Sequence, residues 1–239
     1  MTGPWPQSPA IVVLTGPGLA RESGFDPFAA ERLPPGLSLQ GVVTADGFGR
    51  DPERVQAFYN ARRRELLTKV TPNAAHEAIS VLELVRKNEV LIVTRNIDDL
   101  HERAKSLAVI HTHGELLKTR CMICTNASER LDDITPDTAC PVCGNAGHLR
   151  PHVVWVGEAL LRMETVYEAV SHCRMLLVIG ASVAAEPWAG LVVDARRAGA
   201  HLSLFTVEPT PGSDVFDEYI SGPLTQTVPE YVKQLIADS

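Results

Sequence analysis

Short apolar runs recur along the whole chain and constrain its fold more than any other feature of the sequence. Clear examples lie at residues 11–15, 90–94 and 175–180, which are rich in Val, Ile and Leu. Runs of this length and composition are typical of strands that are buried on both faces. Segments with helical character separate them, so the sequence predicts an α/β fold with a parallel sheet covered by helices on both faces.

The other elements follow from the same patterns. The segment 29–49 is rich in Pro and Gly, and we expect a long loop of the kind that often forms a lid. Asp51 is a plausible cap for a helix that begins at Pro52. Further strands are expected at 109–113, 153–156 and 202–207, and further helices at 73–87, 188–198 and 231–237.

Composition and charge exclude several classes of function. The chain has 239 residues and a net charge of −7, so we expect no broad surface for nucleic acid. No apolar run approaches the roughly 20 residues that span a bilayer, and the first residues do not resemble a secretory signal. We therefore expect a cytoplasmic protein without a membrane partner. Its length is typical of one large domain or of one domain with a small insertion.

Four of the five cysteines form two Cys-x-x-Cys pairs, Cys121 with Cys124 and Cys140 with Cys143. Disulfides are not expected in a cytoplasmic protein, and two such pairs are typical of a structural zinc site. Four thiolates complete the coordination of zinc, so this ion would stabilise structure and take no part in chemistry. The alternative is four reduced core cysteines, although the neighbouring Asp, Asn and Thr residues are unlike a core.

Small and polar residues follow the predicted strands where each strand ends. Ligands of parallel sheets bind beyond the carboxyl ends of the strands, so these residues predict a binding crevice. Gly16–Gly18 precedes a predicted helix, where backbone N–H groups can meet a pyrophosphate; the alternative is a tight turn that only needs glycine. The other segments are 95–101, 113–114, 180–182 and 206–209.

Two of these segments carry residues suited to catalysis. Asn96 and Asp98 could orient a cationic leaving group, and His113 could act as a general base beside them. His111 lies two residues before His113, so the two side chains point the same way in an extended segment. A metal site would need a third ligand, which is not evident, and we expect a histidine satisfied by its surroundings.

Taken in order, these motifs resemble those of the sirtuins, which are NAD-dependent protein deacylases. The resemblance covers nearly the whole chain. The segments 58–63 and 149–155 are most similar to the bacterial class III branch, which prefers short acidic acyl groups such as succinyl and malonyl. The matching motifs lie at 15–24, 94–103, 113–116, 153–157, 180–182 and 207–209, together with the four paired cysteines.

The resemblance implies a Rossmann-like domain with a small zinc-binding domain, and NAD and zinc as cofactors. The substrate would be an acyl-lysine protein or peptide, and the products nicotinamide and O-acyl-ADP-ribose. The implied Rossmann-like parts are 1–28, 73–117 and 151–239, the loop and helical part of the small domain is 29–72, and the zinc module is 118–150.

The resemblance also implies roles for single residues. His113 would activate a ribose hydroxyl, while Asn96 and Asp98 would hold the ribose and nicotinamide. Tyr59 and Arg62 share a helix face and would bind a carboxylate at the end of the acyl chain, unless they only pack and solvate the helix. Val154 and Val156 would contact the substrate. The other implied contacts to NAD are Gly16, Pro17, Gly18, Glu22, Phe28, Arg95, Ile97, Gly180, Ala181, Ser182, Thr206 and Glu208.

Several residues depart from the sirtuin pattern around the cofactor. Pro17 replaces the usual Ala and removes an N–H, and Ala29 replaces the usual Arg. Arg95 replaces the usual Gln and puts a fixed charge beside a cationic nicotinamide. These departures leave open a divergent enzyme that hydrolyses NAD, transfers ADP-ribose or deacylates a small molecule, or a binding protein without catalysis. Further departures are Val156 for Phe, Ala181 for Thr and Thr206 for Asn.

Overall fold

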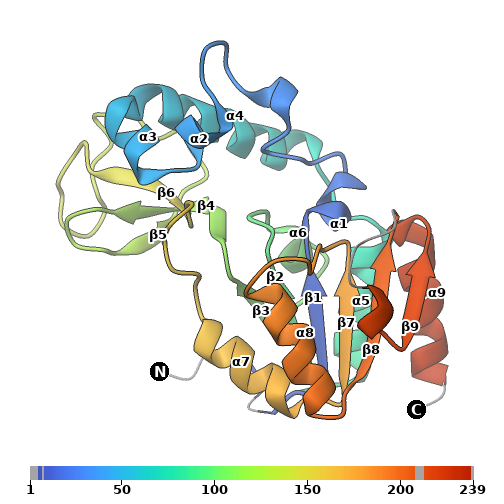
Figure 1. Ribbon diagram of the computed structural model, residues 1–239. Coiled ribbons are helices and arrows are strands. Elements are labelled where there is room, and N and C mark those ends of the chain that lie inside the picture. Colours follow the sequence, from blue (N-terminus) through green and yellow to red (C-terminus); the bar gives the residue numbers. More distant parts are fainter. Residues whose placement is uncertain (1–4, 7, 208–212, 238–239) are drawn as a thin grey trace.

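Two sheets organise the computed structural model, which describes residues 5–6, 8–207 and 213–237 (Figure 1). The larger sheet has six strands in the order β3-β2-β1-β7-β8-β9, and the recorded neighbours are parallel. Its strands are β1 (Ile11–Thr15), β2 (Val90–Thr94), β3 (Val109–His111), β7 (Met175–Ile179), β8 (His201–Thr206) and β9 (Glu218–Ser221).

Alternate side chains of the central strand enter different cores, which explains the unbroken apolar runs. Val12 and Leu14 pack with helices α7 (Met163–His172) and α8 (Trp188–Arg197). Ile11 and Val13 pack instead with α5 (Ala74–Val85) and α9 (Leu224–Ala237). The prediction of a parallel sheet covered on both faces is therefore confirmed.

The smaller sheet is antiparallel and lies beyond the carboxyl ends of the larger one (Figure 1). Its central strand β4 (Gly114–Cys121) pairs with β5 (Ala127–Glu129) and β6 (Leu149–Val153). Helix α4 (Pro52–Lys69) packs on it through an apolar cluster that includes Phe58, Tyr59, Leu66, Leu116, Val153 and Trp155.

The structure corrects the predicted elements in several places. The strand expected at 153–156 does not extend the large sheet, because Val153 pairs with Gly114 and ends β6. The strand expected at 109–113 ends at His111, because the Thr112 N–H makes the last ladder bond to the Thr94 oxygen and the chain then turns at Thr112 and His113. The loop expected at 29–49 contains α2 (Leu39–Val42) and α3 (Ala45–Arg50), whose starts are capped by Ser38 and Thr44. Elements that the sequence did not predict include α6 (Leu100–Arg103), α7, β4, β5, β9, the first four residues of β6 and the first half of α9.

Candidate active site

The carboxyl ends of three central strands are level with one another. Thr15 of β1 lies between Thr94 of β2 and Ile179 of β7 in the register of the sheet. The segments that follow these strands therefore start from one edge. This edge faces the smaller sheet (Figure 1).

Glycines allow the segments after β1 and β7 to touch. A Cβ atom on Gly18 would lie 2.8 Å from the Gly180 oxygen, and one on Gly16 would lie 2.7 Å from the Ala181 Cβ. Pro17 is the first residue of α1 (Pro17–Arg21), where the helix needs no N–H from it. The Pro17 ring therefore fits the turn. The substitution removes only the backbone N–H of residue 17, which a ligand could otherwise use as a hydrogen-bond donor.

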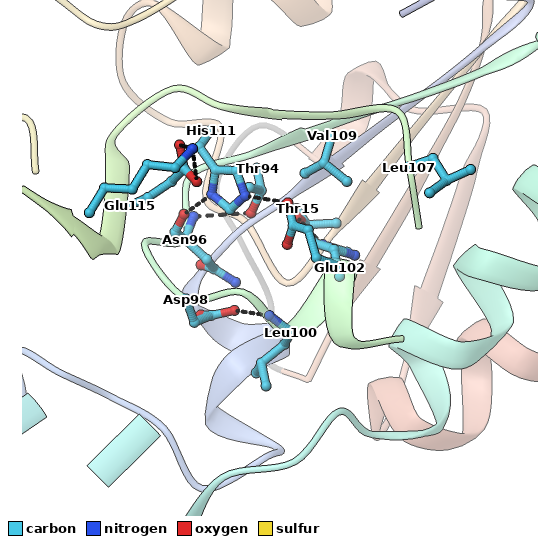
Figure 2. Close-up of polar contacts among 12 residues, drawn as sticks. Thr15, Thr94, Asn96, Asp98, Leu100, Glu102, Leu107, Val109, His111 and Glu115 are labelled. Atoms are coloured by element: carbon cyan, nitrogen blue, oxygen red, sulfur yellow. Dashed lines mark hydrogen bonds and ion pairs between the residues drawn. The ribbon is translucent and has the colours of Figure 1, made fainter. Parts of the chain in front are cut away.

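Asn96 and Asp98 lie in the segment between β2 and α6 (Leu100–Arg103), and Figure 2 shows Asn96 between His111 and Asp98. The Asn96 amide nitrogen Nδ2 is buried and has no hydrogen-bond partner among the described residues. Asp98 is 3% exposed and accepts a 3.2 Å hydrogen bond from the Leu100 N–H. Burial raises the pKa of Asp98 to about 6. A bound ligand would satisfy these groups, because buried polar atoms are rarely left unpaired.

His111 contacts this segment on the side of Asn96 that faces away from Asp98 (Figure 2). Its Nδ1 lies 3.1 Å from the Asn96 backbone oxygen, and its Nε2 lies 2.8 Å from a Glu102 carboxylate oxygen. Burial alone lowers the pKa of His111, but the hydrogen bond and charge of Glu102 offset this and raise the pKa to about 9. Both ring nitrogens therefore donate at neutral pH, and the expectation of a satisfied histidine is confirmed.

His113 is held between a hydroxyl and an aromatic ring. Its Nδ1 lies 3.0 Å from Thr112 Oγ1, and its ring stacks on Trp188 with centroids 5.9 Å apart. Burial, and then the charge of Arg95, lower the pKa of His113 to about 4. The ring is therefore neutral at pH 7, which is the form that a general base requires.

Arg95 joins the segments after β2 and β7. Its guanidinium donates from Nη1 to the Ser182 backbone oxygen at 2.6 Å and lies 5.0 Å from the centre of the Trp188 ring. Trp188 thus contacts both the Arg95 guanidinium and the His113 ring. The sequence did not predict a role for Trp188, which lies at the start of α8, far along the chain from both partners.

The four paired cysteines converge, as their spacing predicts. All four sulfur atoms lie within 4.8 Å of one another, and the Sγ atoms of Cys121 and Cys143 are 3.7 Å apart, as are those of Cys124 and Cys140. Disulfide-bonded sulfurs would be about 2 Å apart. Four thiolates around a zinc ion at about 2.3 Å would be separated by about 3.8 Å. The cluster therefore fits a tetrahedral zinc site.

Tyr59 and Arg62 lie on α4 at the small sheet. The buried Tyr59 hydroxyl donates to the Val42 oxygen at 2.9 Å and accepts from Trp155 Nε1 at 3.0 Å. Arg62 forms an ion pair with Glu65, with 3.2 Å between Nε and Oε2. Phe28 packs on both aromatic residues of this helix, 6.2 Å from Phe58 and 6.4 Å from Tyr59 between ring centres.

The remaining predicted residues lie on or near the same segments. The Val154 N–H donates to the His113 oxygen at 2.8 Å, whereas the Val156 side chain is 72% exposed. The Glu22 carboxylate accepts from the N–H groups of Leu224 and Thr225, so it caps α9. Ile97 and Ala181 are buried, Ser182 is exposed, Thr206 ends β8, and Glu208 lies outside the described residues.

Comparison with known proteins identifies the family. A sequence model of the Sir2 family matches residues 16–187. The chain belongs to the Sir2 family. The NAD-dependent protein deacylase of Escherichia coli is 44% identical over 232 residues, which cover 96% of this chain and 83% of that protein. The deacylase of Salmonella typhimurium is 42% identical over 232 residues, covering 96% and 85%. The resemblance to bacterial sirtuins is thereby confirmed.

Solved structures of Sir2 proteins agree with this fold. A Sir2 homologue in complex with NAD has a TM-score of 0.85 and 31% identity, covering 95% of this chain and 89% of its own. A Sir2 protein bound to acetylated peptide has a TM-score of 0.78 and 25% identity, covering 95% and 92%. Within the described residues, no helix combines the length and apolar character needed to cross a membrane.

Proposed function

We propose that this Sir2-family protein removes acyl groups from lysine side chains in an NAD-dependent reaction that releases nicotinamide and O-acyl-ADP-ribose. The observation that carries the proposal is that a neutral His113 and the unpartnered amide nitrogen of Asn96 both follow strand ends at one edge of the sheet. A base and a positioning amide are the two groups that this chemistry asks of the protein. The names of the bacterial relatives support the same activity.

The residues at this edge fit NAD. The buried Nδ2 of Asn96 is a free donor, and the close glycines after β1 and β7 let backbone approach a ligand. When bound, NAD supplies a glycosidic bond whose cleavage releases nicotinamide and leaves an acceptor for the acyl group. Asn96 and Asp98 would orient the ribose and nicotinamide, and His113 would accept the proton of a ribose hydroxyl. The other proposed contacts are Gly16, Gly18, Phe28, Arg95, Ile97, Gly180, Ala181, Ser182 and Thr206.

The acyl-lysine would enter between the two sheets. Within the described residues, we assign the Rossmann-like parts to 1–28, 73–113 and 154–239, and the parts that face them to 29–72 and 114–153. The boundaries expected at 117 and 151 move because the small sheet begins at Gly114 and its strand β6 ends at Val153. Tyr59 and Arg62 would bind an acyl carboxylate, because a guanidinium offers a permanent charge and paired donors. We also propose a cytoplasmic location, where thiols such as that of Cys173 stay reduced. A small acylated molecule is the other substrate that such a site could accept.

The test is a single assay with peptides that carry acetyl-, malonyl- or succinyl-lysine. The protein is incubated with NAD, and mass spectrometry quantifies nicotinamide, deacylated peptide and acyl-ADP-ribose together. Equal amounts of the three products are expected. Nicotinamide without deacylated peptide would instead indicate NAD hydrolysis or ADP-ribosyl transfer.

The variant His113→Ala should lower turnover by about 10²–10⁴-fold, which is the usual contribution of a general base. His172→Ala is the matched control, because His172 is exposed at the end of α7. Turnover in His113→Ala equal to that of the control would reject the base and with it the proposed mechanism.

A further inference from the structure

The Thr112 hydroxyl contacts both the Thr94 backbone oxygen and the His113 ring, and these two contacts determine where its proton lies. Thr112 is fully buried, and its Oγ1 donates to the Thr94 backbone oxygen at 3.0 Å. The same Oγ1 lies 3.0 Å from Nδ1 of His113. A hydroxyl carries one proton, and a carbonyl oxygen can only accept. Because the Thr112 proton is used at Thr94, the contact with His113 requires a proton on Nδ1.

We propose that Thr112 is a positioning residue that holds His113 in the tautomer protonated at Nδ1, so that Nε2 carries the lone pair. The inference rests on the proposed function, in which His113 takes a proton from a ribose hydroxyl. In a neutral imidazole, the hydrogen bond made by one nitrogen decides which form the other takes. The opposite tautomer would present an N–H to the substrate where a base must present a lone pair.

The surroundings hold Thr112 and His113 rigidly enough for this role. The Thr94 oxygen accepts both the N–H and the hydroxyl of Thr112, each at 3.0 Å, so Thr112 is fixed to the end of β2. Trp188 covers one face of the His113 ring, with 22° between the ring planes. Burial and the charge of Arg95 keep the pKa of His113 low, at about 4, so the tautomer of the neutral ring is what matters at pH 7.

The arrangement also explains a threonine directly before the predicted base. The chain turns at Thr112 and His113, after β3 ends and before β4 begins. This turn lets two successive side chains meet, which a continuous strand would prevent because its neighbours point to opposite faces. The contact between the Thr112 hydroxyl and the His113 ring is therefore possible because β3 ends at His111.

The experiment compares Thr112→Val, which removes the hydroxyl at nearly constant shape, with Thr112→Ser, which keeps it. Thr119→Val is the matched control, because Thr119 is also buried and its hydroxyl lies 3.5 Å from Ser128 in the small sheet. Nitrogen-15 NMR of the histidine rings reports which nitrogen of His113 is protonated, in the full chain without NAD. Steady-state kinetics with NAD and an acetyl-lysine peptide supply the second measurement.

Protonation at Nδ1 is expected in the unmodified protein, in Thr112→Ser and in Thr119→Val, and a shift toward Nε2 protonation in Thr112→Val. The kcat of Thr112→Val should fall at least about tenfold with little change in the KM for peptide, as part of the 10²–10⁴-fold due to a general base. An unchanged tautomer in Thr112→Val, or an equal loss of kcat in the Val and Ser variants, would overturn the inference. A lack of deacylation by the unmodified protein would contradict the proposed function instead, and the NMR would still report the tautomer.

Discussion

At the scale of single residues, the site depends on where charge lies relative to His113. Arg95 replaces a neutral residue of the sirtuin pattern, and its guanidinium is bound by the Ser182 oxygen and the Trp188 ring. The sequence could place Arg95 beside the site but could not predict its partners, which follow a different strand. The sequence also could not predict the contact of Thr112 with His113, because only the turn after β3 brings the Thr112 hydroxyl to the histidine ring.

The variant Arg95→Gln should raise the pKa of His113 from its value of about 4, because the Arg95 charge disfavours the imidazolium. The neutral base is lost as the pH falls through this pKa, so the acid limb of activity should move to higher pH. Asp98 has a pKa of about 6, so its titration would also affect the pH profile of activity. The pKa of His113 is therefore measured directly, by NMR titration. Arg95→Lys should keep the low pKa, as should the exposed control Arg196→Gln. Identical titrations in all four proteins would show that Arg95 does not act on His113.

At the scale of elements, strands that are buried on both faces were predictable and strands of the small sheet were not. Strands β1, β2 and β7 are apolar at almost every position because helices cover both sides. Strand β4 instead contains three half-buried charged residues, Glu115, Lys118 and Arg120, between its buried residues. Its sequence therefore shows no long apolar run. The apolar run at 153–156 predicts a strand of the large sheet, and this prediction is wrong. Val153 pairs with Gly114 of β4, which is far away in the sequence and has no recognisable strand pattern.

Helix α4 offers a prediction about acyl preference. Glu65 pairs with Arg62 from one turn further along the helix, and it also binds Arg32 from the preceding loop. This carboxylate competes with the acyl carboxylate proposed for Arg62. Glu65→Gln should raise kcat/KM for succinyl peptides by about two- to fivefold, equivalent to about 0.4–1 kcal/mol, the range of partly exposed ion pairs. Acetyl peptides should be unaffected.

Two further variants complete that comparison on α4. Arg62→Met should reduce turnover of succinyl peptides more than that of acetyl peptides, because only the former carry a carboxylate. Glu53→Gln removes an exposed carboxylate from the first turn of the same helix and should change neither. If Glu65→Gln raises turnover of acetyl and succinyl peptides equally, Glu65 does not compete for a carboxylate.

At the scale of the whole molecule, the zinc site and the catalytic edge are linked by one strand. Strand β4 begins at Gly114, directly after His113, and ends at Cys121. The cysteine cluster has a small core of its own, with Ile134 and Leu149 buried beside Cys121 and Cys140. So few apolar residues stabilise little by themselves, and metal binding supplies folding energy to such modules. The large sheet has two extensive cores of its own, and neither contains any of the four paired cysteines.

Removal of zinc should therefore loosen the small sheet and leave the large sheet intact. Metal analysis should find one zinc ion per chain, and it should be lost in Cys121→Ser but retained in Cys173→Ser, because Cys173 packs in the core under α7. After chelation, hydrogen exchange should accelerate in 118–150 while β1, β2 and β7 stay protected, and deacylation should fall because β4 anchors the turn that holds His113. Equal exchange and activity with and without chelator would contradict the zinc site. Loss of protection in both sheets at once would show that the two fold as a single unit.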